Sequence, residues 1–218
     1  MSKNVPVVEK IHKVNDQLAL ENRETLDRAG IVSLNLMASP GAGKTSLIER
    51  TLEVLGSQYN IAVIDGDLAS SIDADRAAAA GATAVQINTG GSCHLDANML
   101  RNAFTKLNLE EFDLLLVENV GNLVCPAGFE LGTHKNILIA STPEGDDKPY
   151  KYPKMYRGVD VLIINKIDLL PLLSFDMDYF QKGVEILNPN LITFPLSCQT
   201  KEGFDTWLDW LTNEIEKA

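Results

Sequence analysis

The stretch ASPGAGKT at residues 38–45 decides the fold of this chain. It follows an apolar run at residues 31–38, which predicts a β-strand, and leads into residues 44–55, whose apolar spacing predicts a helix. Gly41 and Gly43 allow the backbone to turn its N–H groups inward, and the N-terminus of the helix adds a positive potential. A glycine-rich loop between a strand and a helix therefore predicts a phosphate-binding loop.

Side chains at the end of this loop complete the expected phosphate and magnesium contacts. Lys44 is expected to reach the β- and γ-phosphates of a nucleotide, and the hydroxyl of Thr45 is expected to bind Mg²⁺. Ala38 stands where such loops usually carry their first glycine, and only a small residue is needed there. The residues that the loop is predicted to place on the nucleotide are Gly41, Ala42, Gly43, Lys44, Thr45 and Ser46.

The remainder of the chain alternates apolar runs of strand length with helical patterns. This alternation predicts an α/β fold of the P-loop NTPase type, with a mostly parallel sheet covered by helices on both faces. Ligands of such a sheet bind beyond the C-terminal ends of its strands. Strands are predicted at 31–38, 60–64, 84–87, 112–117, 137–140, 159–164 and 191–194, and helices at 44–55, 69–80, 94–107 and around Phe204, Trp207, Leu208 and Leu211.

The N-terminal region predicts an amphipathic helix that ends near Gly30. We expect residues 1–30 to form a helix that packs on a P-loop GTPase domain made of residues 31–218, because apolar helix stripes usually face their own domain. A helix that binds a partner protein is the alternative. The apolar stripe is predicted to consist of Val7, Ile11, Val14 and Leu18.

Composition restricts the class of protein. The chain has 218 residues, of which 45% are hydrophobic and 22% charged, as expected for one globular α/β domain. Its net charge of −11 argues against binding to nucleic acid and to anionic membranes. No apolar run reaches the roughly 18 residues of a membrane-spanning helix. Three cysteines cannot all pair within the chain, and reduced cysteines are typical of the predicted location, the cytoplasm.

Two acidic segments that follow predicted strands are candidates for the magnesium site. Asp67 is expected to bind Mg²⁺ directly or through water, with an Asp-Gly turn capped by aspartate as the alternative. Glu118 ends another apolar strand and is expected to supply the second acidic group. With Gly121 it resembles the DxxG switch of GTPases, in which the glycine N–H faces the γ-phosphate. The predicted catalytic residues are Lys44, Asp67, Glu118 and Gly121.

The sequence NKID at residues 165–168 follows a buried strand and predicts a guanine site. The carboxylate of Asp168 can accept hydrogen bonds from both N1–H and the 2-amino group of guanine, whereas adenine leaves it unpaired. Lys166 is expected to lie along the base, and Asn165 to connect this segment to the phosphate loop. Ser197 follows the last strand, at the position where GTPases use a backbone N–H for the guanine oxygen.

Two thiols and an imidazole follow two further strands. Cys93 and His94 leave the end of one strand and Cys125 the end of the next, so the fold is expected to bring them together beside the nucleotide. Thiolates and imidazoles are ligands for Ni²⁺ or Zn²⁺ rather than for Mg²⁺ or Ca²⁺. Buried cysteines that serve only in packing are the alternative.

Taken together, these segments resemble the GTPase family that delivers nickel to nickel–iron hydrogenases. The resemblance runs from about residue 31 to the C-terminus. Its most specific parts are the Cys-His pair at 93–94 and the NLVCP sequence at 122–126. The other matching segments are the phosphate loop, PEGDDKP at 143–149 and NKID at 165–168.

This resemblance implies a homodimer that forms with GTP and holds Ni²⁺ or Zn²⁺ at its interface through Cys93, His94 and Cys125 of each subunit. GTP or GDP then controls dimerisation and release of the metal to a nickel-chaperone accessory protein and to the hydrogenase large subunit. Some relatives carry a cysteine-rich or histidine-rich N-terminal stretch, which this chain lacks, so nickel storage is not expected. His12 is the one N-terminal histidine, expected to be an ordinary surface or core residue.

The expected reaction is in-line attack of water on the γ-phosphate, with Lys44, the loop N–H groups and Mg²⁺ stabilising the charge. Asn122 stands where other GTPases carry a water-orienting glutamine, so slow intrinsic hydrolysis is expected. Asp67 is a candidate for orienting the water. Lys148 is expected to reach a nucleotide across the dimer interface.

Three other interpretations compete with this one. A urease-accessory nickel GTPase has a similar fold but carries a Cys-Pro-His segment, whereas Ala127 follows Cys125 and Pro126 here. A small-molecule kinase with the same loop requires an acceptor pocket and tolerates ATP, which Asp168 disfavours. A metal-binding module with a vestigial nucleotide site is opposed by the intact Gly-Lys-Thr and NKID segments.

Overall fold

The computed structural model describes residues 7–68 and 70–217, with side chains described from residue 12 onwards. Within that range, seven parallel strands form one sheet in the order β3-β2-β4-β1-β5-β6-β7. The strands are β1 (Val32–Ala38), β2 (Ile61–Asp67), β3 (Thr83–Asn88), β4 (Leu114–Glu118), β5 (Lys135–Ser141), β6 (Val161–Asn165) and β7 (Ile192–Pro195).

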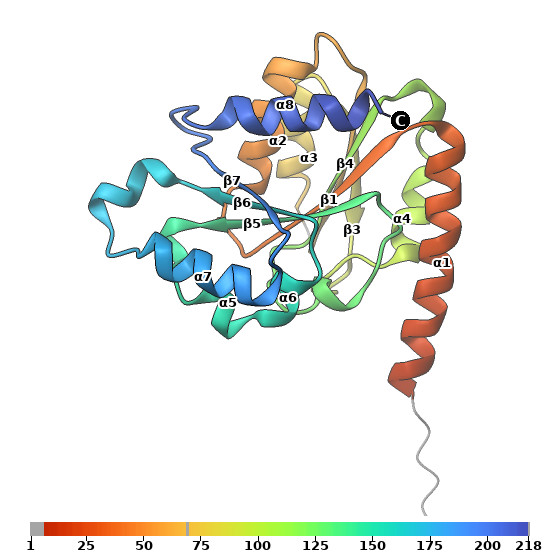
Figure 1. The fold of residues 1–218 in the computed structure, drawn as a ribbon. Helices are drawn as coiled ribbons and strands as arrows, with labels where there is room; N and C mark the ends of the chain where they lie inside the picture. The colour runs from red at the N-terminus through yellow and green to blue at the C-terminus, as the bar shows by residue number, and fades with distance from the viewer. Residues whose placement is uncertain (1–6, 69, 218) are drawn as a thin grey trace, which may run out of the picture.

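Helices cover both faces of this sheet (Figure 1). On one face α2, α3 and α8 pack against the strands; on the other, α1 and α4 cover one half and α6 and α7 the other half. The α-helices are α1 (Val7–Ala29), α2 (Lys44–Leu55), α3 (Ile72–Ala79), α4 (Ala97–Phe104), α5 (Lys148–Lys151), α6 (Pro153–Arg157), α7 (Met177–Leu187) and α8 (Phe204–Ile215). Short 3₁₀ helices are η1 (Leu109–Glu111), η2 (Pro126–Gly128), η3 (Thr142–Glu144) and η4 (Ile167–Leu172).

The central strands are buried on both faces, which explains their nearly continuous apolar sequences. In β1, Leu34 and Leu36 face the core under α2 and α8, while Met37 faces the core under α6 and α7. Each fully buried leucine of this kind stabilises the fold by about 2 kcal/mol relative to an exposed one. The sheet is thus a rigid platform, and the loops after β1, β2 and β4 leave it side by side.

The predicted strands and their surrounding helices are confirmed, with differences at the ends of elements. β2 continues to Asp67, three residues beyond its predicted end, because Asp65 and its neighbours still pair with β3 and β4. α3 and α4 start three residues after their predicted starts, leaving the segments before them free to form binding loops. Helix α7 is absent from the elements predicted from the sequence, although Asp176 caps it and Phe180 and Val184 bury one face.

The N-terminal helix α1 is confirmed, but its predicted packing face is wrong at Val14, which is 62% exposed. The side chains of Val7 and Ile11 lie outside the described residues. The buried face is instead formed by residues displaced by one position from the apolar stripe, and it includes two asparagines that bond to backbone groups of the domain. These buried residues are Asn15, Ala19, Asn22 and Leu26.

Hydrogen bonds hold this helix in place together with the fully buried Leu26. Asn22 donates to the carbonyls of Ala97 and Leu131, both at 2.8–2.9 Å. Gly132 packs so closely that a Cβ there would lie 2.2 Å from the carbonyl oxygen of Ala19, a contact that only glycine permits. Among residues 7–68 and 70–217, no helix is both long and apolar enough to cross a bilayer.

Candidate nucleotide and metal sites

A cavity of about 1290 Å³ opens where the strands end, and the loop after β1 forms its floor. Gly43 has a φ of 111° and precedes Lys44, the first residue of α2. A Cβ at Gly43 would lie 2.2 Å from Nδ2 of Asn165, so glycine is needed there both for its conformation and for space. No side chain caps the N-terminus of α2, which leaves its N–H groups available to an anion.

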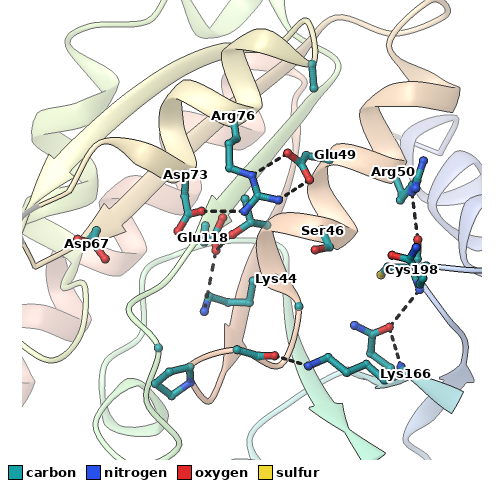
Figure 2. A pocket seen from close by; sticks show the side chains of 18 of the residues that line it. Lys44, Ser46, Glu49, Arg50, Asp67, Asp73, Arg76, Glu118, Lys166 and Cys198 are labelled. Carbon is teal, nitrogen blue, oxygen red and sulfur yellow. Dashed lines mark hydrogen bonds and ion pairs between the residues drawn. The ribbon is translucent and has the colours of Figure 1, made fainter. Parts of the chain in front are cut away.

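Three carboxylates meet at one corner of this cavity: Asp73 and Glu118 line it beside Lys44 (Figure 2), and the buried Asp65 lies next to them. One oxygen each from Asp65, Asp73 and Glu118 lies within 4.8 Å of the others. The hydroxyl of Thr45 donates to Glu118 at 2.8 Å, and Nζ of Lys44 lies 3.9 Å from the same oxygen. Parallel pairing places Asp65 directly beside Glu118 in the sheet, which explains why two acids from distant segments meet.

The electrostatics of this corner favour a hard cation. Burial raises the pKa of Asp65 to about 7, and burial also raises that of Glu118 to about 7, with Lys44 opposing both shifts. Oδ2 of Asp65 is buried without a hydrogen-bond partner. An unpaired buried carboxylate oxygen is costly, and a divalent cation with oxygen ligands would satisfy it. The donor set therefore fits Mg²⁺.

The structure divides the predicted magnesium residues. Thr45 and Glu118 lie at the carboxylate corner, whereas Asp67 lines the cavity outside this group and accepts a hydrogen bond from the N–H of Ser70 at 2.8 Å. Figure 2 shows Asp67 on the side of Asp73 away from Lys44. Asp65 and Asp73 were not predicted; the signal for Asp65 was its place in the same Asp-Gly-Asp sequence, while Asp73 lies inside a helical pattern.

The segment after β4 lies against the phosphate loop. A Cβ at Gly121 would approach Cα of Pro40 to 3.1 Å, so the two loops are in contact at that point. The N–H of Asn122 donates to the carbonyl of Ala38 at 2.8 Å. A phosphate bound in the loop would therefore lie beside Gly121, as the predicted switch requires.

Asn165 connects the base-recognition segment to its neighbours. Its Nδ2 donates to the carbonyl of Ala42 at 2.9 Å, and its Oδ1 accepts from the backbone N–H groups of Lys166 at 2.8 Å and Cys198 at 3.2 Å. Nζ of Lys166 donates to the carbonyl of Gly41 at 2.6 Å. One buried amide thus holds three loops in a fixed relation, and the predicted contact between Asn165 and the phosphate loop is present.

Asp168 offers an unsatisfied acceptor at the base end of the cavity. Its Oδ1 is buried without a hydrogen-bond partner. A base with two adjacent N–H donors would satisfy this carboxylate, and guanine has that edge. Ser197 is fully buried, and its hydroxyl oxygen accepts from the N–H groups of Gln199 and Thr200 at 3.1 and 3.0 Å. This fixes the loop after β7 beside the base position.

Cys93, His94 and Cys125 form a second cluster, with their ligand atoms within 4.8 Å of one another. The two sulfurs are 2.8 Å apart, and Sγ of Cys93 is 3.7 Å from Nδ1 of His94. Burial lowers the pKa of His94, which favours the neutral imidazole that binds metals. Two thiols and a neutral imidazole fit Ni²⁺ or Zn²⁺.

Aromatic rings support this cluster from the side of α1. Phe129 stacks on the imidazole of His94 with ring centroids 3.8 Å apart, and the ring centroid of His12 lies 5.0 Å from that of Phe129. Asn15, one turn after His12, donates to the carbonyl of Glu130 at 2.8 Å. His12 is therefore part of the wall of the cluster, which sequence reasoning assigned to no site.

Lys148 is the predicted nucleotide residue that the fold does not bring to the cavity of its own chain. It begins α5, and its Nζ lies 5.7 Å from the ring centroid of Tyr152. The remaining predicted nucleotide residues of the phosphate loop and of NKID line the cavity or bond to residues that do.

Comparison with known proteins gives consistent matches. The profile of the CobW/HypB/UreG nucleotide-binding domain matches residues 33–194. Hydrogenase maturation factor HypB of Azotobacter vinelandii is 46% identical over 200 residues, which are 92% of this chain and 66% of that protein, so the chain spans just under two thirds of this relative. Probable hydrogenase maturation factor HypB of Methanocaldococcus jannaschii is 42% identical over 212 residues, 97% of this chain and 96% of that protein.

Among solved structures, the crystal structure of HypB from Helicobacter pylori in complex with nickel has a TM-score of 0.89 to this fold and 37% sequence identity. The match covers 93% of this chain and 95% of that structure. The likeness thus extends over nearly the whole fold.

Proposed function

The chain belongs to the CobW/HypB/UreG nucleotide-binding family, and on that premise we propose that it is a metal-binding GTPase that couples nucleotide state to dimerisation and to nickel delivery in hydrogenase maturation. Relatives at 46% and 42% identity are named hydrogenase maturation factors, and the related structure at 37% identity holds nickel. One observation carries the proposal: a single short loop connects the nucleotide cavity to the thiol cluster.

That loop is residues 118–125, and each end of it belongs to a different site. Glu118 lies at the carboxylate corner, and Gly121 packs against the phosphate loop. Asn122 donates through Nδ2 to the carbonyl of Cys93 at 3.2 Å, and Cys125 carries the second thiol. Because so few residues separate the two sites, a shift of the loop at a γ-phosphate would move a metal ligand directly.

For hydrolysis, the chain supplies positioning and charge. Lys44 and the N–H groups at the start of α2 hold the phosphates, while Gly121 offers an N–H toward the γ-phosphate. Thr45, Asp65, Asp73 and Glu118 would hold Mg²⁺, which when bound would neutralise negative charge on the phosphates. Asp67 remains our candidate for orienting the attacking water through its place at the cavity wall. Without a glutamine after Gly121, turnover is proposed to be slow.

For base selection, the unsatisfied carboxylate oxygen of Asp168 supports guanine as the base. Asn165 and Lys166 hold this segment against the phosphate loop, so base and phosphate recognition are built as one unit. ATP would leave Asp168 buried and unpaired, which argues against a kinase that uses ATP.

For dimerisation, we assign Lys148 to the nucleotide of a second copy of the chain. The variant Lys148→Ala is expected to remain monomeric with a non-hydrolysable GTP analogue, as measured by light scattering after gel filtration. Lys151→Ala is the matched control, since Lys151 lies in the same helix and pairs with Asp147. A Lys148→Ala protein that still dimerises with the GTP analogue would remove this assignment.

For metal delivery, Cys93, His94 and Cys125 are proposed to bind Ni²⁺ as cargo, with Zn²⁺ as a competitor. Three donors leave the coordination incomplete, and a second copy or water would complete it. The proposed recipients are an accessory nickel chaperone and the hydrogenase large subunit.

The decisive experiment measures Ni²⁺ and Zn²⁺ binding by equilibrium dialysis in the presence of GDP or a non-hydrolysable GTP analogue. Wild-type protein should bind Ni²⁺ with different affinities in the two nucleotide states, and Cys93→Ser should lose binding in both. Cys198→Ser is the matched control, because Cys198 is buried beside the base site and away from the cluster. Equal affinities in the two states would refute the coupling, and unchanged binding by Cys93→Ser would refute the metal site.

A further inference from the structure

An ion-pair chain leads from α2 through Arg76 to the carboxylate corner (Figure 2). Nε and Nη2 of Arg76 donate to the two carboxylate oxygens of Glu49, at 2.9 and 2.6 Å. Nη1 of the same guanidinium donates to Asp73 at 3.3 Å. A guanidinium that binds one carboxylate through two parallel hydrogen bonds is fixed in orientation as well as in distance.

Among the described residues, Arg76 is the side chain that bonds to the carboxylate of Asp73. Helix α3 has eight residues, of which only Ala74 and Ala77 are buried, and no side chain caps its N-terminus. Ile72, next to Asp73, is 65% exposed. Packing on α2, β2 and β3 and a hydrogen bond from the N–H of Ala74 to Asp65 hold the helix, but they do not fix the rotamer of the partly exposed Asp73 side chain. Helix α2, in contrast, is anchored by buried residues along its whole length.

The pairs themselves contribute little stability. The side chains of Glu49, Asp73 and Arg76 are 32–43% exposed, and partly solvated ion pairs typically contribute below about 1 kcal/mol. The ion pairs matter for orientation instead, because the oxygen of a Mg²⁺ ligand must be placed within fractions of an ångström. Glu49 lies one turn after Thr45 on α2. The ion pairs through Arg76 therefore link the Asp73 carboxylate to the same helix that carries the Thr45 hydroxyl.

We infer that Glu49 and Arg76 are positioning residues that hold the carboxylate of Asp73 at the magnesium corner. The inference rests on the proposed function, since it concerns how the same nucleotide site binds its cation. Both side chains line the nucleotide cavity but stand outside the cluster of Asp65, Asp73 and Glu118. Glu49 orients Arg76, and Arg76 orients Asp73.

The sign of the effect of replacing Arg76 separates positioning from simple electrostatics. A guanidinium near a cation site repels Mg²⁺, so if charge alone mattered, Arg76→Gln would tighten Mg²⁺ binding. If Arg76 positions Asp73, the same substitution weakens it. Loss of partners that orient metal ligands typically reduces metal affinity 10- to 100-fold, and about tenfold is expected here because Thr45, Asp65 and Glu118 remain.

The experiment titrates Mg²⁺ by calorimetry into the complex of the full chain with a non-hydrolysable GTP analogue. Arg76→Gln and Glu49→Gln are each expected to raise the dissociation constant of Mg²⁺ about tenfold, and the double variant to raise it no further, since both break one chain of contacts. Arg76→Lys should show an intermediate value. Glu53→Gln is the matched control, as Glu53 lies on the same helix but pairs with Arg50 and Lys201.

An unchanged or lower Mg²⁺ dissociation constant in Arg76→Gln overturns the inference, as does additivity in the double variant. Arg76→Lys is the second variant in case Arg76→Gln unfolds, because it keeps the positive charge but cannot bind both oxygens of Glu49 in parallel; a Mg²⁺ dissociation constant equal to that of wild type would overturn the inference as well. If wild-type protein binds neither the GTP analogue nor Mg²⁺, the proposed function itself fails. If wild-type protein binds both and the variants bind Mg²⁺ equally well, only the positioning inference fails.

Discussion

Replacing Asp168 by asparagine tests base recognition most directly. The substitution leaves the size and shape of the side chain almost unchanged, but it replaces one carboxylate oxygen, an acceptor, by an NH₂ group, a donor. Oδ1 of Asp168 is buried without a partner in the described structure, so no bond to another protein group compensates for a lost contact with the base. In the variant, one hydrogen bond to guanine should therefore be lost, and the new NH₂ donor of the asparagine should face an N–H donor of the base.

The size of the effect follows from two contributions. A hydrogen bond to a charged group contributes about 1.5–3 kcal/mol, and leaving a buried donor unpaired costs about 1–3 kcal/mol. Their combination, about 2.5–6 kcal/mol, corresponds to a loss of GDP affinity of about 10²- to 10⁴-fold. Xanthine presents a carbonyl in place of the 2-amino group, so the asparagine should gain affinity for xanthine nucleotides.

Fluorescence titration with labelled GDP and labelled XDP measures both changes in one protein. Asp209→Asn, at an exposed position of α8, is the control for loss of a negative charge. An Asp168→Asn protein that binds GDP with wild-type affinity, or that weakens GDP and XDP equally, would refute the assignment of Asp168 to the base. A loss restricted to GDP with a gain for XDP is the expected result.

Three further outcomes are expected. Gly43→Ala should abolish nucleotide binding and lower the Tm, because its Cβ would lie 2.2 Å from Nδ2 of Asn165 at a φ of 111°; wild-type GDP affinity by calorimetry would contradict this. Burial raises the pKa of Cys198 to about 12, so only about 10⁻⁴ of this thiol is ionised at pH 8. Iodoacetamide should therefore label Cys198 of the native protein very slowly at pH 8, and the rate should rise tenfold per pH unit. Rapid labelling at pH 8, detected by mass spectrometry, would refute its burial. Asn22→Ala removes two buried hydrogen bonds that hold α1, and urea unfolding should show a loss of about 1–3 kcal/mol, while an unchanged midpoint would mean that α1 contributes nothing to global stability.

Much of the fold could be predicted because its signals are local. The phosphate loop between a strand and a helix, and the apolar runs of the central strands, depend on neighbouring residues alone. Helix α7 was not predicted because Gly183 and a mixture of polar residues interrupt its apolar pattern. The buried face of α1 was not predicted because Asn15 and Asn22 are buried with hydrogen bonds to distant backbone groups. Hydrophobic periodicity does not detect such bonds.

The candidate sites show the same division. Lys44, Thr45 and Asp168 could be named because each has a fixed place in a short pattern. Asp73 could not, since it reaches the carboxylate corner from α3, and the packing of that helix against α2 and the sheet cannot be seen in the sequence around it.

The amino-acid sequence by itself determined the parallel α/β fold, the phosphate loop and the identity of the thiol and imidazole side chains, because these follow from local spacing and side-chain chemistry. Only the tertiary structure decided that Asp65 and Glu118 stand side by side in adjacent strands, and that Cys93 and Cys125 lie 2.8 Å apart. Strand order and register set the first of these arrangements, and the course of the loops beyond β3 and β4 sets the second. Both result from the packing of the whole domain rather than from any one segment.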